Sequence, residues 1–159
     1  MMAGGFFSMR SASDLLEKLG RDSEKLSATT DADTLFNFFV TAWSLHDWIA
    51  AEHPALKQSV DALFDGELLY CQEIGNKAKH FELTRQRGDP RRSSDPTTQT
   101  FDFGTLNTMP VNEGLVNGGG TRWQLAYSDR IAIDDVNQYA ELVLHCLRSF
   151  FQDNNIGSA

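Results

Sequence analysis

The sequence predicts a mainly α fold: a four-helix-bundle-like domain with a β-hairpin or small meander inserted before the last helix. Three observations predict it. Apolar residues recur at three- and four-residue steps over 33–51, 55–84 and from 134 onward, they alternate with polar residues over 98–128, and a Pro-containing polar segment separates the two patterns. Because helical spacing lies on both sides of the strand pattern, we expect the strands to be an insertion in a helical bundle.

The length and the acidity of the chain limit the number of domains and the classes of ligand that we expect. It has 159 residues, of which 41% are hydrophobic, so we expect one domain over 1–159 with a packed core and a flexible stretch at 1–12. The net charge of -8 argues against a general binder of nucleic acid or of an anionic membrane. The N-terminal residues lack the basic start and the long apolar run of a signal peptide, which favours a cytoplasmic protein.

The first two helices are expected over 13–27 and 33–51. Ser11 and Ser13 are candidate N-caps of the first, which carries four leucines among charged residues. The second has a broad apolar stripe, formed by Leu35, Phe38, Phe39, Ala42, Trp43, Leu45 and Ile49. The opposite side is polar and includes Thr41, and Trp48 stands there as a partner contact or as a lid over a loop.

A long helix, with an interruption at Asp65-Gly66, is expected from 55 to about 84 after Pro54. The segment 85–98 contains two of the four prolines and no aliphatic residue, so it predicts an exposed loop. A hairpin or small meander should follow over 98–128, with a turn at Asn117–Gly120.

The last helix has the cleanest amphipathic pattern. We expect Asp134 to be its N-cap. Its apolar face is predicted to contain Val136, Tyr139, Ala140, Val143, Leu144, Leu147, Phe150 and Phe151.

Metal and cysteine chemistry find little support in the sequence. Cys71 and Cys146 are far apart and form no Cys-x-x-Cys pair, so both are expected to be reduced core thiols. His46-Asp47 has the dipeptide of the HD phosphohydrolases, but no earlier histidine is present to complete a metal site, and the helical pattern favours a buried, hydrogen-bonded His46. We therefore expect no metal and no cofactor.

The most informative polar group lies near residue 80. Helical rotation gathers Glu73, Asn76, Lys77 and His80 on a face different from the apolar one. Asn76 and His80 are four residues apart and could act on one ligand, with Lys77 and Lys79 stabilising an anion. The alternative is a solvated helix face with an ordinary exposed histidine.

The charge is unevenly distributed around this group. Between Lys77 and Arg92 there are six Lys and Arg, Arg85 among them, against two acids, so this basic island has a local balance of +4 in an acidic chain. Such an island is a candidate contact for a phosphate. It could equally pair with acids of the preceding segment, which are Asp61, Asp65, Glu67 and Glu73.

A bundle helix with Asn-x-x-x-His at its end, followed by basic residues and a later amphipathic helix, resembles the HEPN superfamily, the nucleotide-binding domain of higher eukaryotes and prokaryotes. The resemblance covers about residues 33–152 without the strands. The chain also resembles small phage- or defence-associated proteins. Active members are metal-independent ribonucleases or nucleotide-modifying toxins that dimerise to join two Arg-x(4–6)-His motifs. Here Asn76 and His80 match the family pattern, and Gly75 stands at the arginine position.

This resemblance implies two functions. The first is a non-catalytic helical interaction module with a protein partner, favoured by Gly75, by the acidity and by aromatic residues expected to be exposed, such as Trp48. The second is a ribonuclease or nucleotide-binding domain, a homodimer with RNA or a nucleotide at the basic island. In it His80 would be the acid/base group with Asn76 beside it, and Lys77, Lys79 and Arg85 would bind phosphate.

Overall fold

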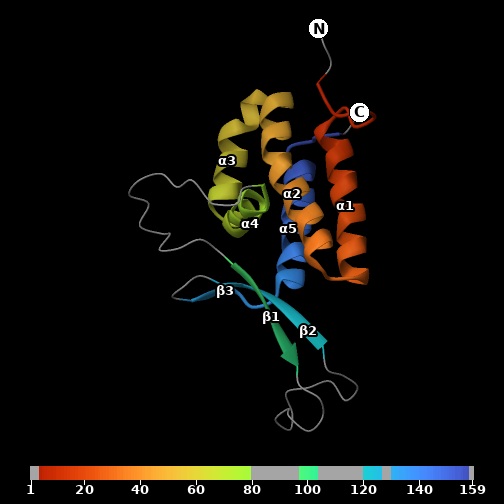
Figure 1. The fold of residues 1–159 in the computed structure, drawn as a ribbon. Helices are drawn as coiled ribbons and strands as arrows, with labels where there is room; N and C mark the ends of the chain where they lie inside the picture. The colour runs from red at the N-terminus through yellow and green to blue at the C-terminus, as the bar shows by residue number, and fades with distance from the viewer. Residues whose placement is uncertain (1–3, 80–96, 104–119, 127–129, 158–159) are drawn as a thin grey trace. The chain divides into compact units, whose positions relative to one another are not determined.

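The computed structural model describes residues 4–79, 97–103, 120–126 and 130–157 (Figure 1). The chain divides into two compact units. The first contains residues 1–83 and 140–159 and is helical; the second contains residues 84–139 and carries the strands. The predicted mainly α class with a strand insertion before the last helix is confirmed.

The first helix, α1 (Ala12–Ala28), begins where the sequence indicated. Ser11 is its N-cap: the Ser11 Oγ accepts from the backbone N–H of Asp14, and the Asp14 carboxylate accepts in return from the backbone N–H of Ser11 at 2.9 Å. This reciprocal box satisfies two backbone donors at the helix start. Leu15, Leu19 and Leu26 form its buried stripe, so the predicted helix and the Ser11 cap are confirmed.

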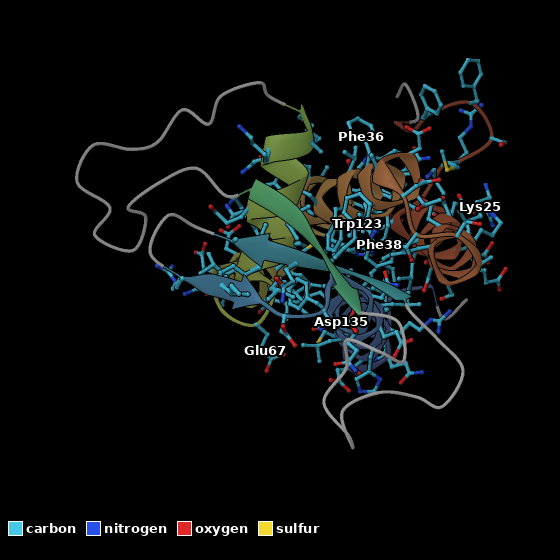
Figure 2. The ribbon with its side chains drawn as sticks, turned by 60° about the horizontal axis from the view of Figure 1, so that its bottom comes forward. Lys25, Phe36, Phe38, Glu67, Trp123 and Asp135 are labelled. Carbon is cyan, nitrogen blue, oxygen red and sulfur yellow. The ribbon has the colours of Figure 1, made fainter. Side chains whose placement is uncertain are left out.

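The second helix, α2 (Ala32–Glu52), runs antiparallel to α1 and lies beside it (Figure 1). Its Glu52 carboxylate accepts from the backbone N–H of Ala12, 2.6 Å away, so the end of α2 meets the positive end of the α1 dipole. The predicted stripe is buried at Leu35, Phe38, Phe39, Ala42, Leu45 and Ile49. Figure 2 shows the contrast between Phe38, inside the helices, and Phe36, at their outer edge.

Thr41 is buried, contrary to the polar side that the sequence indicated for it. Its hydroxyl donates to the buried Asp22 carboxylate of α1 at 2.8 Å and accepts from the Lys18 ammonium at 2.8 Å. Lys18 also pairs directly with Asp22. A polar residue can therefore face α1 because these three groups satisfy one another inside the contact.

The predicted interruption at Asp65-Gly66 is confirmed. A short 3-10 turn, η1 (Pro54–Leu56), leads into α3 (Lys57–Asp65), which ends at Gly66, and α4 (Leu69–Lys79) follows after three residues. In Figure 1, α3 extends along the plane of view whereas α4 is seen nearly end-on. The break therefore changes the direction of the chain and lets α4 pack against α2.

The last helix, α5 (Val136–Asp153), starts one residue later than the predicted cap implies. Asp135 is the capping side chain, because its carboxylate accepts from the backbone N–H groups of Asn137 and Gln138. Asp134 instead accepts from the side chain of Gln124. From Ala140 on, the helix belongs to the first unit, where Val143, Leu147 and Phe151 are buried.

The second unit contains an antiparallel sheet in the order β1 (Thr97–Phe103), β2 (Gly120–Ala126) and β3 (Ile131–Ile133). Thr100 lies opposite Trp123 in the β1–β2 register. The predicted meander is thus confirmed, although the short β3 lies beyond its expected end. Residues 85–96 of the predicted loop and most of the predicted turn lie outside the described residues. Within the described helices, none has the length and apolarity needed to cross a membrane.

Candidate functional site

Gly75, which stands where the HEPN pattern has an arginine, lies in the contact between α4 and α2. A Cβ atom at this position would lie 2.6 Å from the Cβ of Trp43 and 3.0 Å from the carbonyl oxygen of Phe39. Both distances are shorter than a relaxed carbon contact, so the two helices approach this closely because residue 75 has no side chain. Position 75 therefore faces the interior and has no space for a guanidinium group.

The polar group predicted around residue 80 is only partly within the described residues. Asn76 and Lys77 are half-buried and Lys79 is exposed. Glu73, expected on the polar face with them, is instead buried, with 1% of its surface exposed. His80 and Arg85 lie outside the described residues, so the described part of this group is Asn76 with Lys77 and Lys79.

Two of the four acids that could have neutralised the basic island, Asp61 and Glu67, have other contacts. Asp61 accepts from Lys57 at 2.6 Å and contacts His46, and Glu67 accepts from the Cys146 thiol. Lys77 and Lys79 belong to the last turn of α4, where cations interact favourably with the negative end of the helix dipole. Their position is thus explained by helix electrostatics without a phosphate.

His46 connects α2 to α3 through two carboxylates. Its Nδ1 lies 2.9 Å from Asp47 Oδ1, and its Nε2 lies 2.8 Å from Asp61 Oδ1. The ring stacks on Trp43 and contacts Phe64 edge-on, so its side chain is 16% exposed. The predicted hydrogen-bonded histidine is confirmed, although it is not fully buried.

The electrostatics of this cluster favour an ionised Asp61. Hydrogen bonds from Lys57 and then from His46 lower the pKa of the Asp61 carboxyl. The cluster provides no nucleophile at the histidine, because both ring nitrogens already face carboxylates. Among the described residues, no group of three or more His, Cys, Asp and Glu is arranged to hold a metal ion. The cluster therefore joins α2 and α3.

An open groove lies between α3 and α5 and was not predicted from the sequence. Its volume is about 550 Å³, and all of its lining belongs to the helical unit. The lining residues are Leu63, Glu67, Leu142, His145, Cys146, Ser149, Phe150 and Asp153. We name it the α3–α5 groove.

The signal for the groove was present in the sequence of α5. Leu142, Cys146 and Phe150 follow one another at four-residue steps, beside the main stripe formed by Val143, Leu147 and Phe151. The sequence pattern assigned Phe150 to the main apolar face and left Leu142 and Cys146 outside it. In the structure Phe151 is buried, whereas Phe150 is half-buried in the groove and Leu142 is 47% exposed.

Cys146 is a half-buried groove residue rather than the predicted core thiol, whereas Cys71 is buried as predicted. The Cys146 thiol donates to a Glu67 carboxylate oxygen, which lies 3.4 Å from the sulfur. Burial, and then this hydrogen bond and negative charge, raise the pKa of the Cys146 thiol. A thiol held protonated in this way is a poor nucleophile, so the groove is suited to binding rather than to covalent catalysis.

The large exposed aromatic residues of the described chain are Phe6, Phe7 and Phe36. Trp48, for which the sequence left a partner contact or a lid open, is half-buried. No family model, curated protein or solved structure matches the chain. The candidate sites are therefore compared by their own geometry. These are the closed contact at Gly75, His46 with a carboxylate at each ring nitrogen, and the open α3–α5 groove.

Proposed function

We propose that this chain is a HEPN-like helical interaction module without catalytic activity, which binds a helical segment of a partner protein in the α3–α5 groove. The observation that carries the absence of catalysis is the contact at Gly75. An arginine that binds the scissile phosphate needs an open position, and a Cβ alone at residue 75 would meet Trp43 at 2.6 Å. Residues near the end of α4 are thus used for packing.

The groove supports the binding function. Folding buries the Val143–Leu147–Phe151 stripe of α5 and leaves Leu142, Cys146 and Phe150 partly accessible beside Leu63 of α3. An amphipathic helix places apolar residues along one side at three- and four-residue steps, and it can lie in a furrow between two helices. Such a partner would cover Leu142, which folding leaves 47% exposed.

Selection of helical peptides tests this function. We would select binders from a display library of 16-residue helical peptides on the full chain and measure their affinity for two variants. Leu142→Ser should weaken the selected peptides about tenfold, which corresponds to about 1.4 kcal/mol, because it removes an apolar anchor. Phe36→Ser is the matched control, since Phe36 is also 47% exposed but lies on α2. The proposal would be contradicted if the selected peptides bound Leu142→Ser as tightly as the wild type, or if the selection gave no binding peptide.

A ribonuclease is the second candidate, and one observation favours it: half-buried Asn76 has two lysines close by in the last turn of α4. This candidate includes a homodimer, because the family site joins two copies. Incubation of labelled RNA with the protein in EDTA distinguishes the two functions. Under our proposal the RNA stays intact with the wild type and with His80→Ala. Cleavage by the wild type that His80→Ala abolishes would favour the ribonuclease.

A further inference from the structure

We infer that the occupant of the α3–α5 groove is a cationic amphipathic helix whose Lys or Arg residues pair with acids on the walls of the groove. This inference rests on the proposed function and adds the charge of the partner. It comes from two sets of observations: the charges that line the groove, and the helix ends beside it.

The charged side chains of the groove are both acidic. Glu67 comes from the α3–α4 turn and Asp153 from the end of α5, and both are exposed. None of the eight lining residues is Lys or Arg, and His145 is the one basic residue among them. An anionic partner would face like charge on both walls, whereas a cationic partner would form pairs without burying an isolated charge.

The helix ends add fixed negative potential. Both α3 and α5 lack a basic residue in the last turn, so no cation of their own neutralises the partial negative charge at their C-termini. Leu63 and Glu67 lie at the end of α3, and Asp153 is the last residue of α5. The partial negative charge of these helix ends therefore favours a cationic partner, as the two carboxylates do.

The dimensions of the apolar floor set the length of the partner. Leu142 and Phe150 are eight residues apart, which at 1.5 Å per residue is about 12 Å along α5. This length matches about two turns of a helix, with apolar anchors at three- and four-residue steps. A second copy of the chain is a poorer occupant, because each copy carries a net charge of -8.

Three peptides of identical apolar pattern test the inference. Each peptide has 16 residues, with Leu at positions i, i+3, i+4 and i+7 so that the leucines share one helix face. The remaining positions are mainly Lys in the first peptide, Gln in the second and Glu in the third. Fluorescence anisotropy with the full chain gives the affinities at 50 and 300 mM NaCl. We expect the Lys peptide to bind at least about tenfold more tightly than the Glu peptide, with Gln between them. The difference should shrink at high salt, because exposed charges are screened.

Variants show whether the groove, rather than the general acidity, gives this preference. The double variant Glu67→Gln/Asp153→Asn should weaken the Lys peptide several-fold and leave the Gln peptide unchanged. The matched control is Glu17→Gln/Glu24→Gln, which removes two exposed acids from α1 and should change neither. Bound peptide should also slow the labelling of Cys146 by a maleimide, because the thiol lies in the groove wall.

The outcomes separate the inference from the function on which it rests. Equal binding of the Lys and Glu peptides, with both lost in Leu142→Ser, overturns the cationic partner and leaves the docking function. The inference is also overturned if the α1 double variant weakens the Lys peptide as much as the groove double variant does. If no peptide depends on Leu142, both fail. A dimer that dissociates on Leu142→Ser assigns the groove to a second copy and also overturns the cationic occupant.

Discussion

The contact of α4 with α2 and the contact of α5 with α3 are built in opposite ways. At Gly75 two helices approach so closely that a single methyl group would meet Trp43 at 2.6 Å. Between α3 and α5 a volume of about 550 Å³ stays open, and Leu142 remains 47% exposed. The first contact is closely packed around Gly75, and the second keeps apolar surface available for another molecule.

This difference shows how one small helical unit can separate stability from recognition. A sealed contact loses free energy when any atom is added or removed, because its neighbours are close-packed. A groove tolerates substitution, because solvent takes the place of the missing atoms. The effect of a substitution on the free energy of unfolding therefore reports which kind of contact a residue belongs to.

The largest effect should come from Gly75→Arg. It forces a long side chain and a charge into the α2–α4 contact, and overpacking and a buried charge together should cost more than about 3 kcal/mol. Urea unfolding followed by circular dichroism measures this. Lys79→Arg, on the exposed side of α4, is the control and should change the stability by less than about 0.5 kcal/mol. A stable Gly75→Arg protein would show that the contact can open and would return the ribonuclease to consideration.

Next in size are two leucines of α5, one on each of its stripes. Leu147→Ala should reduce the free energy of unfolding by about 2–5 kcal/mol, because Leu147 is fully buried and the change leaves a cavity. Leu142→Ala should cost less than about 1 kcal/mol, because Leu142 already faces solvent. The same urea titration compares them. Similar losses for the two variants would mean that the groove is closed in solution.

Thr41→Val tests the sealed polar contact between α1 and α2. It removes the hydroxyl that lies between Asp22 and Lys18, and the buried carboxylate loses one donor. We expect a loss of about 1–3 kcal/mol. Ser44→Ala is the control, since the Ser44 hydroxyl bonds to the carbonyl of Val40 on its own helix and should contribute less than about 0.5 kcal/mol. Equal effects would argue against the inter-helix network.

The smallest effect concerns Asp61, in the partly open cluster of α2 and α3. Because Lys57 and His46 lower its pKa, ionised Asp61 stabilises the fold above its unfolded pKa of about 3.9, and this contribution disappears as the pH falls through the folded pKa. Asp61→Asn should thus be less stable than the wild type at pH 6 and should approach it near pH 3. Urea midpoints across this range measure the difference. Asp65→Asn, outside the cluster, should show a smaller change.

The local signals of the sequence predicted most of the elements. Ser11 capped α1, Gly66 ended α3, and the alternation around Trp123 predicted a strand, because caps, helix ends and strand faces depend on neighbouring residues. The Asp134 cap was wrong by one residue, since the Asp134 side chain accepts instead from Gln124 of β2. No local pattern reports a partner ten residues away.

What the sequence determined by itself is the set of helices and strands and the acidity of the chain. Only the tertiary structure decided that Gly75 is a packing residue, that Thr41 and Glu73 are buried, and that the Leu142 stripe of α5 lines a groove. The reason is that periodicity shows which residues share a helix face but not which neighbour covers it. The packing role of Gly75 and the second apolar stripe of α5 become evident only when the adjacent helix is in place.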